Sequence, residues 1–410
     1  MVHGLLKCAP MKNRRAVSAL LATCAFASIF TLGVVSGCSS GSDGVGGPGG
    51  NAGGNNGGGP GATGPSGGGS NDAATPTPTP TPAEAGGGAP SGMDSGSVAA
   101  DVYVPTPDDG AVPDGFWDAG TIPVAKNVMT FVFLNRTNGK LADSEVFWSF
   151  KNGTVTETHS IADMPTYDMP ANASGRMYFY LCGAATSCTG DPTKSKYYDF
   201  IEFTIGASQY NGNTTRVDAF GIKVANRLHC ADGYDVAVGE DYETFAEDRA
   251  VTFQKFLNEV PAEFQALAQP PFAPYRIVEP GAGGFKAGGM YATYYDSFVN
   301  TLWANNGLTI AKPGPNGSGL GAYPNISAAI MRHVGDKAGT FAADGTLLDK
   351  TLWATNANFY NAAPADYYAR FWHTHGLNAK AYGFPYDDVG GNSSYISHAK
   401  PQYMLVALGW

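Results

Sequence analysis

Charged side chains are scarce in this chain of 410 residues. They make up 15% of it, with 25 basic against 35 acidic residues and a formal net charge of −10. Such a balance, without a basic stripe, argues against binding to a phosphate backbone, so we expect no nucleic acid among the partners. The low charge and 12% aromatic content are typical of an exported, sheet-rich protein that handles neutral ligands.

Cysteine is scarce as well, with six residues, of which three lie beyond residue 38. Cys182 and Cys188 enclose a short loop, and a disulfide between them is plausible in an exported protein, although Cys230 could pair with either. A metal site is the alternative use of these residue types. Its candidate ligands are His229, Cys230, His373 and His375. The pair 373–375 has no third and fourth ligand at a recognisable spacing, so we expect no metal.

One long apolar run, residues 16–35, follows a basic start at 11–15 and ends in small residues before Cys38. This pattern resembles a bacterial lipoprotein signal over residues 1–38, with a diacylglyceryl group on the Cys38 thiol. An ordinary signal peptide or an uncleaved membrane helix is the alternative, because about 20 apolar residues can span a bilayer. Ser39, rather than Asp, follows the cysteine and favours the outer membrane or cell surface, with secretion as the other possibility.

Residues 39–123 are rich in Gly, Ser and Asn, with a Thr-Pro run at 75–82 and an acidic, proline-containing end. Because nothing there can bury a core, we expect a disordered tether. The folded part is predicted to span residues 124–410.

Within the folded part, the pattern predicts strands at 127–134, 144–150, 176–181 and 402–408. A capping box of Thr244 and Glu247 precedes apolar residues at helical spacing up to Val260, and further helices are expected at 325–334 and 364–372. The fold class is therefore mainly β with an α/β lobe. We expect a β lobe at about 124–235 and 370–410, and a mixed α/β lobe at about 236–369.

Two carboxylates are the best candidates for chemistry. In the alternating segment 198–205, Glu202 shares one strand face with Phe200 and Thr204, while the other face is apolar. If residues 206–214 form a hairpin connection, a second strand at 215–222 brings Asp218 near Glu202 on the same sheet. Cross-strand geometry then places the carboxyls roughly 6 to 9 Å apart. That separation suits an inverting glycosidase, whereas solvated carboxylates on an exposed face are the plainer interpretation.

Several sequence blocks resemble the glycoside hydrolase family 64 β-1,3-glucanases. They are residues 199–204, 217–221, 358–375, 381–389 and 401–410. The resemblance implies the laminaripentaose-producing type and a thaumatin-like fold, a β-sandwich or barrel lobe facing a partly helical lobe across a wide substrate cleft. It also implies that Glu202 is the general acid and Asp218 the general base. This division requires the pKa of Glu202 to exceed that of Asp218, so that Glu202 is protonated while Asp218 is ionised.

The same resemblance implies a monomer that hydrolyses β-1,3-glucan, such as laminarin, curdlan or fungal wall glucan, into short laminari-oligosaccharides without a cofactor. Contact with the membrane is expected through the lipid anchor alone. The predicted substrate-binding residues are Thr204, Asp387, Asp388 and Asp191. Adjacent acids such as 387 and 388 can instead brace a loop, and Asp191 can instead belong to a turn.

Aromatic residues could stack on glucose rings, with a place in the core as the alternative. The candidates are Tyr291, Tyr294 and Trp303. Two rival functions remain: a surface-anchored glucan-binding, thaumatin-like module without catalysis, and a structural lipoprotein of the envelope. The second rival explains the tether but not the family-like blocks.

Overall fold

The computed structural model describes residues 111–152, 156–183, 186, 188, 191–314 and 319–410. The predicted signal segment, the lipidation site Cys38 and most of the predicted tether lie outside the described residues. Within the described part, no helix is both long enough and apolar enough to cross a membrane.

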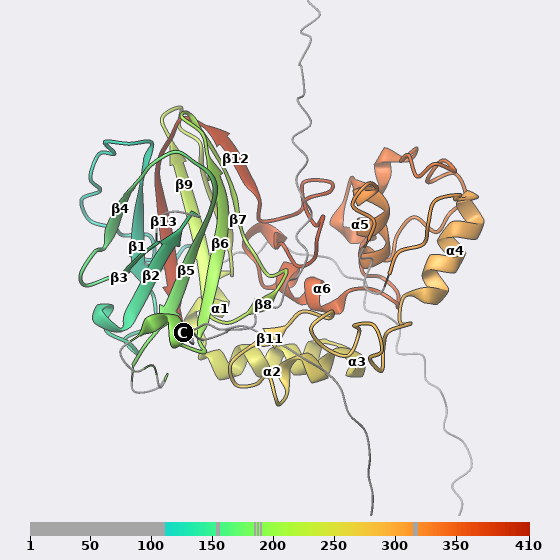
Figure 1. Cartoon of the computed structure of the whole chain (residues 1–410), viewed down its shortest axis with the longest axis horizontal. Helices are drawn as coiled ribbons and strands as arrows, with labels where there is room; N and C mark the ends of the chain where they lie inside the picture. The colour runs from blue at the N-terminus through green and yellow to red at the C-terminus, as the bar shows by residue number, and fades with distance from the viewer. Residues whose placement is uncertain (1–110, 153–155, 184–185, 187, 189–190, 315–318) are drawn as a thin grey trace, which may run out of the picture. The chain divides into compact units, whose positions relative to one another are not determined.

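Two sheets pack face to face and form a sandwich (Figure 1). The six-stranded sheet has the order β12-β7-β6-β5-β2-β3, and the five-stranded sheet has the order β10-β9-β13-β1-β4. The strands of the first are β2 Val146–Lys151, β3 Thr156–Ser160, β5 Asn172–Leu181, β6 Tyr198–Ile205, β7 Gln209–Thr214 and β12 Ile396–Ala399. The strands of the second are β1 Met129–Asn135, β4 Thr166–Met169, β9 Lys223–Cys230, β10 Asp235–Gly239 and β13 Pro401–Gly409.

Inward-facing apolar side chains from both sheets fill the sandwich. Phe131 and Met404 from one sheet and Trp148 and Phe203 from the other belong to a single buried cluster. The period of two along each strand directs these residues inward and leaves the alternate positions to the outer faces. The predicted β lobe is therefore confirmed.

Strand β13 lies in the middle of the five-stranded sheet. It runs parallel to β1 and antiparallel to β9. The prediction that a C-terminal strand completes the β lobe is confirmed, with bounds one residue wider at each end than expected.

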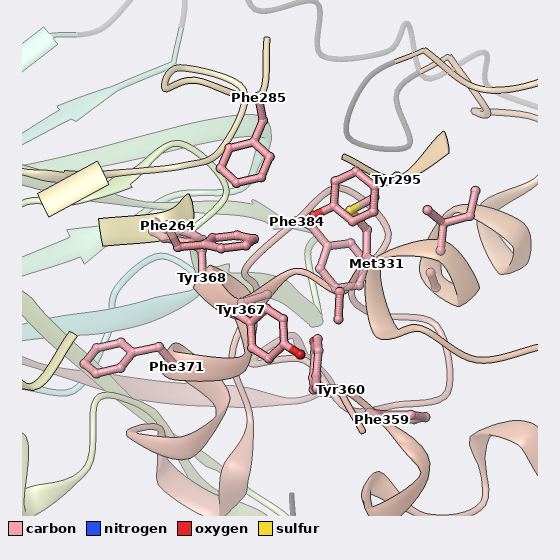
Figure 2. Packing of buried hydrophobic residues seen from close by; sticks show 14 of the residues in the cluster. Phe264, Phe285, Tyr295, Met331, Phe359, Tyr360, Tyr367, Tyr368, Phe371 and Phe384 are labelled. Carbon is pink, nitrogen blue, oxygen red and sulfur yellow. The ribbon is translucent and has the colours of Figure 1, made fainter. Parts of the chain in front are cut away.

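The helices are α1 Tyr242–Ala246, α2 Arg249–Glu259, α3 Ala262–Gln265, α4 Asp296–Asn306, α5 Pro324–Arg332 and α6 Tyr367–Thr374. All except α1 gather around a second core, part of which Figure 2 shows, whereas Tyr242 and Phe245 of α1 belong to a separate buried cluster. The 3-10 turns are η1 Asp143–Glu145, η2 Pro192–Lys194, η3 Ala266–Ala268, η5 Lys350–Trp353, η6 Asn356–Asn358 and η7 Leu377–Ala379. A two-stranded sheet of β8 Ala219–Phe220 and β11 Ile277–Val278 borders this core. Helices at the three predicted places are confirmed as α2, α5 and α6.

The predicted capping box is wrong. Thr244 lies inside α1, whose cap is Asp241, and Glu247 follows that helix as its C-terminal neighbour. Asp241 accepts a hydrogen bond from the Thr244 backbone at 2.7 Å, so the helix begins one turn earlier than the pattern suggested. Glu247 instead accepts a hydrogen bond from the Thr252 hydroxyl in α2.

The predicted boundary at residue 124 is also wrong. Phe116 and Trp117 are buried and pack with Tyr242 and Phe245, and the Trp117 indole donates to the Tyr242 hydroxyl. Arg136 donates to the Phe116 carbonyl at 2.6 Å. The folded part therefore includes residues near 116. The second core likewise extends past the expected limit at 369, because α6 and Phe384 belong to it.

Asp366 begins α6 from a fully buried position. Its carboxylate caps the helix by accepting from the Ala369 backbone at 3.1 Å. Burial raises its pKa to about 8, against the opposing effect of that hydrogen bond. Since the folded-state pKa lies above the unfolded value of about 3.9, its contribution to stability is full below that value and is lost as the pH rises through about 8.

We predict that Asp366→Asn keeps the cap but removes this pH dependence. The free energy of unfolding of the parent should fall relative to that of the variant between pH 5 and about pH 8, by at most about 1.4 kcal/mol per pH unit, and its melting temperature should fall with it. Asp349→Asn is the control, because that cap is exposed and its pKa is lowered by the Thr351 hydroxyl. Parallel melting curves for the parent and Asp366→Asn across this range would contradict the prediction.

Candidate active site

Glu202 lies on the outer face of β6, where the alternation predicted it. Ile201, Phe203 and Ile205 point into the sandwich core, while the Glu202 side chain stays 35% exposed. Directly opposite on β5, Arg176 donates to Glu202 Oε1 through Nε at 2.7 Å, and its Nη2 lies 2.6 Å from the same oxygen. The acid is thus held by a half-exposed ion pair.

Asp218 does not lie on the strand that was predicted for it. The strand that returns beside β6 is β7, joined by the short turn 206–208, and its Asn213 pairs with Glu202. Asp218 follows in the segment between β7 and β8, and β8 pairs with β11 in a different sheet. The placement on the same sheet is therefore wrong, because residues 209–214 form a strand in place of the expected connection.

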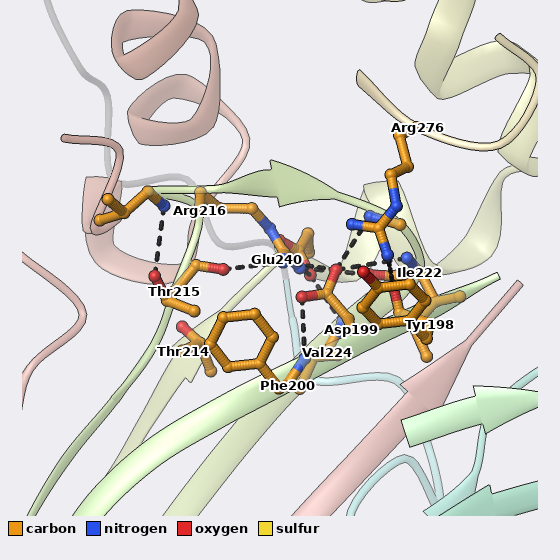
Figure 3. Close-up of polar contacts among 12 residues, drawn as sticks. Tyr198, Asp199, Phe200, Thr214, Thr215, Arg216, Ile222, Val224, Glu240 and Arg276 are labelled. Carbon is orange, nitrogen blue, oxygen red and sulfur yellow. Dashed lines mark hydrogen bonds and ion pairs between the residues drawn. The ribbon is translucent and has the colours of Figure 1, made fainter. Parts of the chain in front are cut away.

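A buried ion network fixes the segment that carries Asp218 (Figure 3). Arg216 lies between Asp199 of β6 and Glu240 beyond β10, with N–O distances of 2.8 and 2.7 Å. All three side chains are less than 5% exposed. Asp199 also accepts from the backbone of Gly221 at 2.9 Å, on the far side of Asp218. Both ends of the segment are therefore tied to the sandwich.

Gly221 allows this segment to approach β6 closely. A Cβ atom at this position would lie 1.9 Å from the Tyr198 carbonyl oxygen. Any larger residue must push the segment away from the strand that carries Glu202.

The electrostatic surroundings of the two acids are linked. The Asp218 carboxyl reaches solvent, yet the surrounding protein raises its pKa by desolvation. The positive charge of Arg176 opposes that shift, and the negative charge of Glu202 adds to it. Arg176 therefore acts on both acids.

Tyr382 and Asp388 extend the site. The Tyr382 hydroxyl donates to Asp388 at 3.4 Å, and burial raises its pKa, with smaller effects from Asp388 and Glu202. The Tyr382 carbonyl accepts from the Arg216 backbone at 2.8 Å. Asp388 is exposed, so a role in binding substrate stays a prediction.

The substrate-binding role predicted for Asp387 is wrong. Its side chain is fully buried, and its oxygens accept from Arg332 at 2.9 Å and from the Gly383 backbone at 2.8 Å, with His373 at 2.9 Å. Burial alone would raise its pKa, but the charges of His373 and Arg332 outweigh it and hold the pKa below the usual range. Asp387 braces its loop, the alternative recognised from the sequence.

Thr204 is exposed two residues beyond Glu202, on the same strand. Asp191 is exposed as well, but it caps the turn η2 by accepting from the Thr193 backbone at 3.0 Å and from the Thr193 hydroxyl at 2.6 Å. The geometry of Asp191 matches the turn alternative. Substrate binding by Thr204 and by Asp191 stays a prediction.

Glu279 is a further acid beside the site that sequence reasoning missed. Its backbone donates to the Asp218 carbonyl at 3.2 Å, and burial raises its pKa to about 7. Its carboxylate accepts from the Gly281 backbone. The sequence Glu-Pro-Gly-Ala-Gly-Gly has no periodicity that points to Asp218. The pairing depends on the β8–β11 contact between distant segments.

The aromatic candidates belong to the second core. Trp303 is buried, and Tyr291 and Tyr294 are partly buried against the same cluster. The core interpretation therefore holds for them.

Two cavities, of about 530 and 390 Å³, lie away from the candidate site, because neither is lined by Glu202 or Asp218.

Cysteine and histidine side chains have separate partners. Cys182 and Cys188 form a disulfide, and Cys230 is free and buried in β9. His229 lies beside Asp235, and His375 bonds Glu259. Among the described residues, no group of three or more His, Cys, Asp or Glu side chains could hold a metal ion.

A pair of carboxylates with different surroundings is the feature that most glycoside hydrolases use for catalysis, so the site is compatible with that class of enzyme. The β-1,3-glucanase model of glycoside hydrolase family 64 matches residues 131–325 and 321–408. The chain belongs to this family.

Known proteins resemble the chain to different extents. The glucan endo-1,3-beta-glucosidase of Arthrobacter sp. (strain YCWD3) is 24% identical over 267 residues, 53% of this chain, which spans about half of that relative (46%). The laminaripentaose-producing β-1,3-glucanase of Paenibacillus barengoltzii, complexed with laminarihexaose, is 28% identical with a TM-score of 0.57, covering 70% of this chain and 77% of that one. A β-1,3-glucanase domain from Clostridium beijerinckii, 22% identical with a TM-score of 0.57, covers 71% of this chain and 100% of that one, and shows the fold alone.

We predict that Gly221→Ala destabilises the protein by about 1–3 kcal/mol, because the added methyl group overlaps the Tyr198 carbonyl. Urea unfolding measures the change. Gly206→Ala is the control, since its nearest neighbour would lie at an ordinary 3.7 Å. Equal unfolding midpoints for Gly221→Ala and the parent would refute the close approach.

Proposed function

We propose that this protein hydrolyses β-1,3-glucan by a single displacement that inverts the anomeric carbon. The observation that carries the proposal is the linked pair Glu202 and Asp218, held on two separately braced segments of a family 64 fold. The relative complexed with laminarihexaose supports a neutral β-1,3-linked substrate. The protein acts as a monomer, which light scattering can test, and releases short laminari-oligosaccharides.

In the proposed reaction, protonated Glu202 gives its proton to the glycosidic oxygen as the bond to the anomeric carbon breaks. Asp218 removes a proton from a water molecule that attacks this carbon from the opposite face. The chain needs no cofactor for these steps, since both proton transfers use its own carboxyls.

Two features of the free site favour the opposite division of roles. Glu202 is ion-paired to Arg176, and the pKa of Asp218 is raised by desolvation. The reversed assignment, with Asp218 as acid and Glu202 as base, is therefore the second candidate. The two assignments differ in which variant tolerates an activated leaving group, because such a group departs without a proton.

We predict that Glu202→Gln and Asp218→Asn each lower the release of reducing sugar from laminarin by about 10²–10⁴-fold. Glu202→Gln should keep much of its activity on an aryl laminarioside with a good leaving group. Asp218→Asn should stay inactive on that substrate until azide replaces the water. NMR of the parent reaction should show the α-anomer first.

Asp163→Asn is the control, because this carboxylate is 74% exposed and follows the edge strand β3. Rescue of Asp218→Asn, rather than Glu202→Gln, by the good leaving group would establish the reversed assignment. Near-parental activity in both variants would contradict the two-acid mechanism. Binding of curdlan by the parent without product would favour a non-catalytic glucan-binding module.

We also propose that the protein is exported and anchored by a lipid on Cys38, at the outer membrane or cell surface. The apolar run before Cys38 supports this, as does the Gly- and Pro-rich sequence after it. Cys38→Ser should lose labelling by radioactive palmitate and leave the membrane fraction, whereas Cys24→Ser, within the apolar run, should retain both. Unchanged labelling of Cys38→Ser would rule out this anchor.

A further inference from the structure

Glu202 lies in register between two polar side chains of neighbouring strands. Arg176 faces it from β5, and Asn213 faces it from β7. Residues directly opposite each other on antiparallel strands have Cβ atoms about 4.5–5.5 Å apart and point to the same face. The three side chains therefore form one row across the sheet.

Arg176 contacts the Oε1 oxygen of the Glu202 carboxylate. Its Nε and Nη2 both approach Oε1, at 2.7 and 2.6 Å, and within the described part of the chain no group hydrogen-bonds to Oε2. The guanidinium lies 4.9 Å from the centre of the Phe200 ring and donates to the Tyr178 hydroxyl at 3.5 Å. These contacts hold the arginine on the sheet face.

Asn213 offers the complementary group. Its Oδ1 is buried, and among the described residues it has no hydrogen-bond partner. A buried acceptor without a donor lowers the stability of the folded state, because its hydrogen bond to water is lost and not replaced. A protonated Glu202 would supply such a donor through the hydroxyl on Oε2.

We propose that Arg176 and Asn213 are positioning residues for proton transfer by Glu202. Arg176 binds Oε1, and Asn213 orients the hydroxyl on Oε2 until the proton passes to the glycosidic oxygen. The electron pair of the broken C–O bond stays on that oxygen, which takes the proton. The negative charge left on Glu202 is shared with the Arg176 guanidinium. This inference rests on the proposed function with Glu202 as the acid.

Among the described residues, three further polar groups act on this row or border it. Asp218 lies beyond β7, and Tyr382 lies beyond α6; the charge of Glu202 raises the pKa of both, after desolvation as the main cause. Asp388 bonds the Tyr382 hydroxyl. Arg176 is the cation in contact with Glu202, so its replacement should change the acid's proton transfer directly.

The test compares Arg176→Met, Arg176→Lys and Asn213→Ala through the pH dependence of kcat/KM. Two substrates are used, a laminari-oligosaccharide and an aryl laminarioside with a good leaving group. Arg176→Met should lower kcat/KM on the oligosaccharide about 10²-fold and move the alkaline limb about one pH unit higher, because the carboxylate loses its opposite charge. The aryl substrate should lose far less.

Arg176→Lys keeps the charge but lacks the planar fork, so its alkaline limb should stay near that of the parent while its rate falls. Asn213→Ala should lower the rate on the oligosaccharide more than on the aryl substrate. Arg227→Met is the control, because Arg227 forms a similar pair with Asp235 at 2.7 Å on the other sheet.

Equal losses of kcat/KM on both substrates, with the alkaline limb of the pH profile unchanged, would overturn the inference. Arg176 would then have a structural role only. A shift of the acid limb alone would overturn it as well, because Glu202 would then be the base. If the parent cleaves neither substrate, the proposed function fails, and the inference fails with it.

Discussion

The buried ion network of Arg216, Asp199 and Glu240 is the constraint on which the candidate site depends. The arginine joins β6, the segment after β7 and the residue after β10, and its own carbonyl accepts from the Tyr368 hydroxyl at 2.7 Å. Removing one member of such a network typically costs about 3–5 kcal/mol, because the others are left charged and buried. Since Tyr368 belongs to α6, the same arginine also connects the sandwich with the helical core.

This connection explains why two acids from different structural settings can work together. Glu202 is held by strand pairing within one sheet, whereas Asp218 is held between the arginine and the backbone of Gly221. A second brace, Asp387 with Arg332 and His373, fixes the loop that carries Asp388. Asp218 and Asp388 therefore each lie next to a buried charged network, which limits the movement of the segment without contacting the carboxylate itself.

The sequence predicted those parts of the site that depend on local periodicity. The alternation of 198–205 determined the face of Glu202, because the period of a strand is fixed. The partner strand β7 was missed because its residues, Gln-Tyr-Asn-Gly-Asn-Thr, are of types common in turns. Its inward positions are Tyr210, Gly212 and Thr214, and a Cβ at 212 would lie 2.8 Å from the Glu202 carbonyl. Likewise, the identical neighbours Asp387 and Asp388 differ through contacts that the local sequence does not show, chief among them the ion pair of Asp387 with Arg332, 55 residues away.

The central position of β13 has a consequence for the order of events during synthesis. The strand that separates β1 from β9 is residues 401–409, so neither of its neighbours can complete its hydrogen bonds until nearly the whole domain has emerged. Pairing between residues about 270 apart in sequence is slow, since a long loop must close first. In a chain of this topology, the five-stranded sheet therefore closes only after residues 401–409 have been synthesised.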